Sequence, residues 1–278
     1  MAVIVVTDSS ACIDPAVAED LNIRVVPLHV LVDGETLREG VDDIPVPPRG
    51  MAVTTSAAAP GEMTIAFRRA LAMSEGDGVV AVHLSRLLSG TWEAARQASS
   101  EFDGSVRVVD SMSAGLGTGF AAIAAARVAR SGGSLDEVYQ CALDVAEDTH
   151  SWLVVDRVDE LRRGGRFDAN TGRVGSVLAS RLLLRLVGGK LELIDKSRTS
   201  SKALSKMVDE AVSAAAVAPV SVAVQHVAAR ERAQRVAAQL RKRIPEVSDV
   251  VIREFGPTLA VHLGGGAVAA LVVPRRKD

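Results

Sequence analysis

Aromatic side chains and cysteines are scarce in this chain of 278 residues. Phenylalanine, tryptophan and tyrosine together make up 3% of it, although 48% of the residues are hydrophobic. The interior must therefore be built from Ala, Val, Leu and Ile, and a pocket in it would have aliphatic walls. Cys12 and Cys141 cannot form a disulfide framework and, without a Cys-x-x-Cys pair, indicate no zinc or redox site. We expect both to behave as small buried hydrophobic residues.

An excess of charge of either sign is also missing. Lysine and arginine number 32 and aspartate and glutamate 34, and no long basic block occurs before the short run at 275–277. We therefore do not expect a nucleic-acid partner. The N-terminal apolar run lacks a basic start and ends at Thr7, too soon for a signal peptide. Arg127 and Pro219 interrupt the Ala-rich segments, so stable membrane insertion is not expected. These features predict a cytoplasmic protein.

The pattern of apolar residues predicts an α/β fold. In the first half, short runs of β-branched residues alternate with helical periodicity, which is typical of a parallel sheet covered by helices. The length suits two packed α/β lobes sharing a cleft better than one large domain. We place the boundary near residue 155, which gives an N-terminal parallel-sheet domain, 1–155, and a C-terminal α/β domain, 156–278.

Several elements can be predicted from local signals. Asp14-Pro15 is typical of a helix start, and the helix that runs through 119–129 should end at Gly132-Gly133. Gly188-Gly189 predicts the turn of a β-hairpin. The segment 42–62 is rich in Pro and Gly and is predicted to be a loop.

Hydroxyl side chains follow three strands expected in the first half. The segments are Thr7–Ser10, Leu88–Thr91 and Asp110–Ser113, and Thr54–Ser56 adds more hydroxyls from the predicted loop. Loops at the carboxyl ends of parallel strands meet at one edge of the sheet, where ligands bind. Each of the three also precedes a helix, whose free N–H groups favour an anion. This edge is therefore suited to a carboxylate or a phosphate.

Helix capping is the alternative interpretation of these residues. Ser, Thr and Asp commonly cap helices, and for 7–10 and 110–113 capping is as good an interpretation as ligand contact. Ser89, Gly90 and Thr91 favour ligand binding more, because a glycine between two hydroxyls lets the backbone approach a ligand closely. No nucleotide-binding loop accompanies them, and the serine nucleophile motif Gly-x-Ser-x-Gly is missing.

Two cationic candidates occur in the second half. His262 precedes Gly264–Gly266, where the backbone can come close to another lobe, and its imidazole can donate a hydrogen bond to an oxyanion. Arg166 follows two glycines and could lower the cost of burying an acid. By contrast, His29 and His83 lie within apolar strands and are expected to be core or loop residues.

Taken together, these segments resemble the DegV family of bacterial fatty-acid-binding proteins. The resemblance lies in seven segments, which occur in the family's order and cover essentially the whole chain. They are VTDSSACI, VVPLHVLVDG, TTSAAAPGE, HLSRLLSGTWEAA, VVDSMSAGLGTG, LRRGGR and VHLGGGA.

The resemblance implies a tunnel between the two lobes that holds one long-chain fatty acid. The family's carboxylate-binding pair falls on Thr55, in the Thr55-Ser56 step, and on Ser89 of Ser89-Gly90-Thr91, and its arginine and histidine fall on Arg166 and His262. The resemblance also implies that the protein itself catalyses no reaction. A separate fatty acid kinase catalytic subunit would phosphorylate the bound carboxylate. Lys196 and Arg198 are the candidate contacts with that kinase, and no cofactor or metal is implied.

This sequence also departs from the family's usual pattern. Ala57-Ala58-Ala59 stands where members commonly have Gln-Pro-Ser, and Gly265 stands in place of a proline after His262. These changes concern the geometry of the loops and hence the preferred acyl chain. A stand-alone hydrolase, with Ser89 as nucleophile and His262 as base, is the alternative function.

Overall fold

The computed structural model describes residues 2–44, 53–156, 158–167, 180–215, 219–245 and 247–275. Contacts between Cα atoms divide the chain into two units. Unit 1 comprises Met1–Glu147 and Gly256–Thr258, and unit 2 comprises Asp148–Phe255 and Leu259–Asp278. The domain boundary expected near residue 155 stays a prediction; the division by contacts falls just before β8 (His150–Val155).

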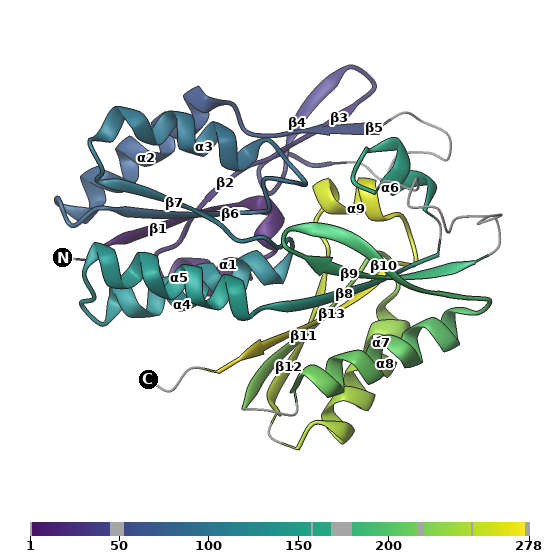
Figure 1. Ribbon diagram of the computed structural model, residues 1–278. Helices are drawn as coiled ribbons and strands as arrows, with labels where there is room; N and C mark the ends of the chain where they lie inside the picture. The colour runs from purple at the N-terminus through teal and green to yellow at the C-terminus, as the bar shows by residue number, and fades with distance from the viewer. Residues whose placement is uncertain are drawn as a thin grey trace. The chain divides into compact units, whose positions relative to one another are not determined.

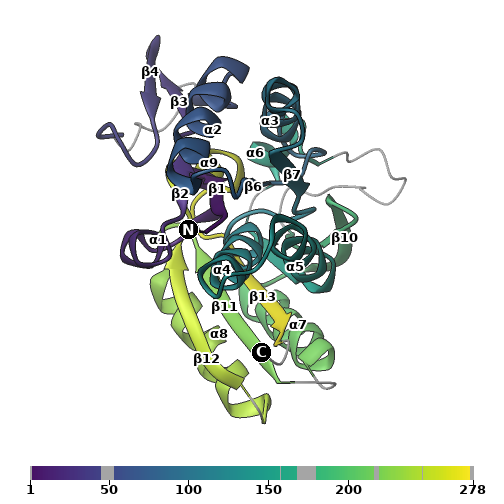
Figure 2. The same ribbon diagram turned by 90° about the vertical axis from the view of Figure 1, so that its left-hand side faces the viewer.

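Unit 1 is built on a four-stranded parallel sheet in the order β2-β1-β6-β7. Its strands are β1 (Ile4–Asp8), β2 (Arg24–Val26), β6 (Val79–His83) and β7 (Val106–Asp110). Its helical segments are η1 (Ser9–Ala11), α1 (Pro15–Asp20), α2 (Pro60–Ser74), α3 (Thr91–Ser99), η2 (Ser100–Phe102), α4 (Leu116–Arg130) and α5 (Leu135–Asp148). Helices α2 and α3 lie on one face of this sheet and α4 and α5 on the other (Figures 1 and 2).

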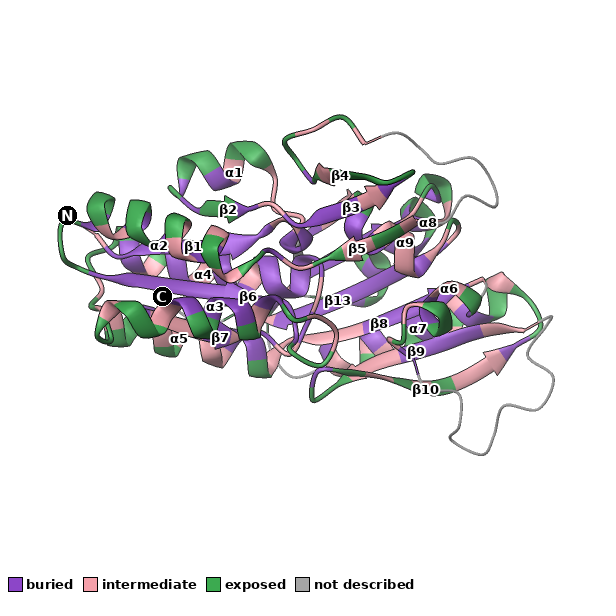
Figure 3. Ribbon diagram, turned by 90° about the horizontal axis from the view of Figure 1, so that it is seen from above, coloured by how far each residue is buried: buried purple, intermediate pink, exposed green. Residues whose placement is uncertain are grey.

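Burial in unit 1 follows from this layered arrangement. All five residues of β6 are buried, because helices cover both faces of the central strands. In Figure 3 the central strands carry the colour of buried residues, whereas the outer turns of α1 and α2 are exposed. The apolar residues between the sheet and α2 and α3 form one cluster in which Phe67, on α2, is the largest fully buried side chain.

A separate three-stranded antiparallel sheet completes unit 1. Its order is β4-β3-β5, with β3 (His29–Val32) between β4 (Glu35–Arg38) and β5 (Val53–Ser56). Strand β5 corrects the prediction that 42–62 is entirely loop. Val53–Ser56 is a short β-branched and hydroxyl run that pairs with β3, and the surrounding Pro and Gly residues masked it in the sequence.

Unit 2 is built on a six-stranded mixed sheet in the order β10-β9-β8-β13-β11-β12. Besides β8, its strands are β9 (Arg181–Val187), β10 (Lys190–Ser197), β11 (Val220–His226), β12 (Val247–Glu254) and β13 (Val268–Pro274). Its helices are α6 (Asp159–Arg163), α7 (Ser200–Ala214), α8 (Arg230–Arg243) and α9 (Pro257–Leu263), the last of which begins in unit 1. The α/β class predicted for both halves is confirmed.

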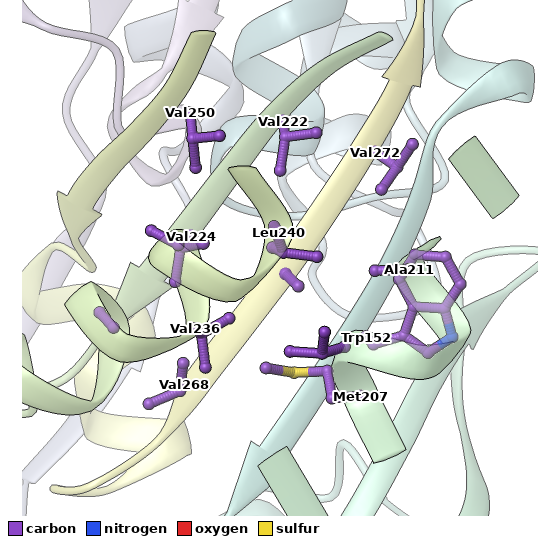
Figure 4. Close-up of a cluster of buried hydrophobic side chains, with 14 of the residues drawn as sticks. Trp152, Met207, Ala211, Val222, Val224, Val236, Leu240, Val250, Val268 and Val272 are labelled. Carbon is purple, nitrogen blue, oxygen red and sulfur yellow. The ribbon is translucent and has the colours of Figure 1, made fainter. Parts of the chain in front are cut away.

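The core of unit 2 lies between its sheet and α7 and α8. Figure 4 shows Leu240 and Val236 of α8 and Met207 of α7 among apolar side chains of β8, β11 and β13. The buried positions of α8 are spaced as one helical face requires: Ala233, Val236, Ala237 and Leu240. Trp152 on β8 is the largest fully buried side chain in this cluster.

Three local predictions are confirmed. Asp14 caps α1, since its side chain accepts a hydrogen bond from Ala16 N at 2.9 Å. The backbone after α4 turns at Gly132, whose φ is +88°. β9 and β10 form the predicted hairpin, and Gly188 and Gly189 both have positive φ, as a type I′ turn requires.

Helices α5 and α9 were not predicted from the sequence. Among the described residues, no helix combines the length and apolar composition needed to cross a membrane.

Candidate functional site

The carboxyl ends of β1 and β6 meet at the point where the sheet of unit 1 changes direction. The chain passes from β1 through α1 to the neighbouring strand on one side, and from β6 through α3 to the neighbour on the other. In open parallel sheets, ligands bind outside the strands at such a switch point. Asp8 ends β1 and His83 ends β6, so both lie at this edge.

Asp8 is a fully buried acid that holds this edge together. Its carboxylate accepts hydrogen bonds from the Ser10 backbone N–H at 3.1 Å and from the Ser10 hydroxyl. It also accepts from Leu84 N at 3.2 Å and lies 2.9 Å from His83 Nδ1. His83 is fully buried as well, as expected of a core histidine, and its Nε2 has no hydrogen-bond partner among the described residues. Asp8 therefore anchors the start of the loop that leads to Ser89.

Ser89 lies at the end of that loop, directly before Gly90, the N-cap residue of α3. Its Oγ accepts a hydrogen bond from Thr91 N at 3.3 Å and lies 2.9 Å from Thr91 Oγ1. Thr91 is buried and Ser89 is partly exposed. This serine braces the backbone at the start of α3, and a hydroxyl beside a helix N-terminus can also be presented to an anion.

Gly90, the residue between them, adopts a helical conformation, with φ −74° and ψ 0°. A Cβ at this position would meet nothing within 4 Å. Its backbone conformation therefore does not require glycine, and the space beside it is open.

Thr55 and Ser56 occupy the last two positions of β5. Thr55 is opposite Val30 of β3, and Ser56 is opposite His29. Because side chains alternate along a strand, Thr55 lies on the face of Val30, which is buried, and Ser56 lies on the face of His29. The threonine that the resemblance assigns to the carboxylate is thus on the more buried face of this sheet.

The loop after β7 is occupied by bracing contacts. Asp110 Oδ1 accepts hydrogen bonds from Met112 N at 2.9 Å and Arg86 N at 3.4 Å. Ser111 Oγ lies 2.8 Å from Thr118 Oγ1 of α4. The polar side chains of Asp110 and Ser111 therefore brace this loop.

In unit 2, His262 and Arg166 lie near one another. His262 is in the last turn of α9, and a Cβ at Gly164 would lie 2.6 Å from its Nδ1, so the ring packs against a glycine. Burial, and to a lesser extent the Arg166 charge, lower the pKa of His262 to about 4. The imidazole is therefore neutral near pH 7 and can offer one N–H while Arg166 supplies the positive charge.

The glycines after His262 are held in place by a charged cluster. Gly264 N donates to Ala260 O at 2.9 Å, which closes α9. Arg232 Nη1 donates to Gly266 O at 3.1 Å and to Asp156 Oδ2 at 2.7 Å. Asp156 also forms an ion pair with Arg181 at 3.0 Å. No local pattern in the sequence indicates this cluster, because Asp156 follows β8, Arg181 lies on β9 and Arg232 lies on α8.

Lys196 and Arg198 lie at the end of β10. Lys196 is the penultimate residue of the strand and is opposite Leu182 of β9, and Arg198 follows the strand and is exposed. Their neighbourhood includes an ion pair between Lys206 and Asp195 at 2.7 Å. Arg198 is thus accessible to a partner, and Lys196 is partly so.

The candidate residues fall into two groups. Thr55, Ser56, Ser89, Gly90 and Thr91 belong to unit 1, and Arg166, His262, Lys196 and Arg198 belong to unit 2. Among the described residues of unit 1, the Ser89 side chain contacts Thr91 and no histidine that could activate it as a nucleophile.

Comparisons with known proteins match this chain to one family over nearly its full length. A family model described as "Uncharacterised protein, DegV family" matches residues 2–275. A DegV domain-containing protein of Mycobacterium tuberculosis is 44% identical over 272 residues, 98% of this chain and 97% of that protein.

Two solved structures are also similar. "DegV, a fatty acid binding protein from Bacillus subtilis" superimposes with a TM-score of 0.86 and is 29% identical, covering 99% of this chain and 100% of that one. A DegV family protein of Thermus thermophilus, whose structure is titled for its fatty acid binding, has a TM-score of 0.91 and 26% identity, with 99% and 100% coverage.

Proposed function

The chain belongs to the DegV family, and from that premise we propose that it is a carrier that binds one long-chain fatty acid by its carboxylate. The full-length similarity to two structures titled for fatty acid binding is the observation that carries this proposal. The hydrolase alternative finds no support in these relatives.

The residues of unit 1 supply neutral donors for a carboxylate. Thr55 and Ser89 offer hydroxyls, and the positive end of the α3 dipole, at Thr91, favours an anion. Hydrogen bonds to the charged form stabilise a carboxylate that has left water. In unit 2, Arg166 offers a positive charge and neutral His262 one N–H. We propose that all four residues serve the same head group.

Burial of the acyl chain provides most of the binding free energy. Each methylene removed from water contributes about 0.8 kcal/mol, so roughly fifteen contribute on the order of 12 kcal/mol before ordering costs. The chain's aliphatic composition suits such a ligand. An affinity of this order would allow the lipid to remain bound during purification.

Alanine substitutions at Thr55 and Thr54 test this site. We expect Thr55→Ala and Ser89→Ala to weaken palmitate binding by about tenfold each, since each removes a hydrogen bond to a charged group. Thr54→Ala is the matched control, because Thr54 is the preceding threonine of β5 and faces the opposite side of its sheet. Equal affinity of Thr55→Ala and Thr54→Ala would contradict the assignment.

The finer proposal concerns the partner. We propose that the bound carboxylate is presented to a separate fatty acid kinase catalytic subunit for acyl phosphate formation, and that Lys196 and Arg198 dock it. Substituting both by glutamate should abolish acyl phosphate formation with that subunit while leaving palmitate affinity unchanged. Retained phosphorylation would exclude these two residues from the docking surface.

A further inference from the structure

His29 contacts both ends of the segment that joins the end of β5 to the start of α2. It is the first residue of β3 and is 9% exposed. Its Nδ1 lies 3.4 Å from Ala57 O, directly after Ser56, and its Nε2 lies 3.1 Å from Glu62 Oε1, in the first turn of α2. Glu62 in turn accepts a hydrogen bond from Ala59 N at 2.7 Å through its other oxygen.

Both partners of the ring are acceptors. A backbone carbonyl and a carboxylate can each only accept, whereas a neutral imidazole carries a single N–H. Both contacts can therefore be hydrogen bonds at the same time only when the ring carries two protons. In the neutral ring, one of the two contacts is a repulsion between lone pairs. Protonation of His29 therefore completes the link between β5 and α2.

This link lies beside the candidate head-group residues. Thr55 and Ser56 are the last residues of β5 that pair with β3, and the segment from Ala57 to Ala59 continues without a strand partner. Ends of strands are where backbone hydrogen bonds open most readily. Hydrogen bonds from His29 to Ala57 O and Glu62 Oε1 hold the backbone in place beyond Ser56.

Three charged side chains face His29 in the described part of unit 1. Glu62 reaches it from α2, and Arg38 is its cross-strand neighbour on β4. Asp42, after β4, interacts with both His29 and Arg38, and the hydrogen bond from Arg38 lowers the pKa of Asp42 to about 2. Asp42 is thus negative near neutral pH, and its partner Arg38 is positive.

We propose that His29 is a positioning residue of the carboxylate site, and that protonation of its ring fixes the end of β5 so that fatty acid binding takes up protons. This inference rests on the proposed function. If the protonated form binds better, binding must draw protons from solution, and affinity must fall as the pH rises. His262 is neutral near pH 7 in the ligand-free protein, because its pKa lies at about 4, and the His29→Gln variant identifies the share of proton uptake that depends on His29.

Calorimetric titration of the delipidated, full-length protein with palmitate tests the proposal. Run near neutral pH in two buffers of different ionisation enthalpy, it counts the protons taken up. We expect uptake by the wild type and a clear loss of it in His29→Gln. From about pH 6 to about pH 8, wild-type affinity should fall about fivefold and that of His29→Gln by less than about twofold.

Two further variants separate this role from a loss of structure. Glu62→Gln keeps an acceptor for Ala59 N but removes the charge that faces the ring, and it should also reduce proton uptake. His150→Gln, on β8 in unit 2, should take up as many protons as the wild type. If His29→Gln took up as many protons as the wild type, the inference about His29 would be overturned and the proposed function would stand. Absence of palmitate binding by the wild type would overturn both the inference and the proposed function.

Discussion

At the level of single residues, the edge of the unit 1 sheet at which β1 and β6 end depends on Asp8. Its buried carboxylate accepts hydrogen bonds from Ser10 and Leu84 and pairs with His83. The sequence showed that Asp8 ends a strand but not which donors it meets, because Leu84 is 76 residues away along the chain. Pairings over such distances are created by the fold and cannot be inferred from local patterns.

Asp8→Asn should therefore be strongly destabilising. The amide retains one acceptor oxygen and places an NH₂ group against donors, so we expect the free energy of unfolding to fall by about 2–4 kcal/mol. Asp20→Asn is the control, since Asp20 forms an exposed ion pair with Arg130 at 2.9 Å, and it should change stability by less than about 0.5 kcal/mol. Urea denaturation measures both, and similar values for the two variants would refute this account of Asp8.

His262 should make stability depend on pH in a defined direction. Its pKa of about 4 in the folded protein lies below the ordinary value of 6.5. The unfolded chain therefore binds more protons between these values, and stability falls as the pH drops from about 6.5 towards about 4. Because His262 is partly exposed, we expect a loss of only about 1 kcal/mol from about pH 7 to about pH 5.

His262→Asn should remove this part of the pH dependence. The measurement is urea denaturation of delipidated wild type and variant at both pH values, in which all other titrating groups cancel in the difference. A variant that loses as much stability as the wild type on acidification would show that the His262 ring is not held neutral by its surroundings.

At the level of elements, capping and turn residues could be recognised in the sequence. Asp14-Pro15 corresponds to the start of α1, and Gly188-Gly189 to the turn between β9 and β10. The missed helix α5 carried a readable signal, with buried residues Val138, Ala142, Val145 and Ala146 at helical spacing. The signal for strand β5 was weaker. Its four residues lie in a segment rich in Pro, Gly and Ala, and they form a strand because they pair with β3.

The β9–β10 turn offers a matched test at one position. Gly188 has a φ of +52°, and a Cβ there would meet nothing within 4 Å, so only the backbone conformation restricts this site. Asparagine adopts positive φ readily, so Gly188→Asn should change stability by less than about 0.5 kcal/mol. Gly188→Val should lower it by about 1–2 kcal/mol. Thermal unfolding of both variants provides the comparison, and equal stability would contradict the turn assignment.

The packing of α8 can be tested in the same way. Leu240 is fully buried in the core of unit 2, so Leu240→Ala should reduce the free energy of unfolding by about 2–5 kcal/mol. The adjacent Gln239 is exposed, and Gln239→Ala should have an effect of less than about 0.5 kcal/mol. If Gln239→Ala proved the more destabilising in urea denaturation, the assigned helix face would be wrong.

At the level of the whole molecule, the α/β class and the family could be recognised from the sequence. Segments such as LSGT and TDSS follow strands β6 and β1, as the predicted edge requires. The sequence did not reveal which other side chains hold those segments in place through hydrogen bonds and ion pairs. His29 illustrates this, since it was expected to be an ordinary core or loop residue and its contact with Glu62 depends on the folding of β3 against α2.

The most direct test of the account is the identity of the lipid that accompanies the protein. Purified protein is denatured, extracted with organic solvent and analysed by mass spectrometry, and delipidated protein is then titrated with palmitate. The account predicts about one long-chain monocarboxylic acid per chain and uptake of palmitate at the same stoichiometry. An extract without fatty acid, together with delipidated protein that does not bind palmitate, would contradict it.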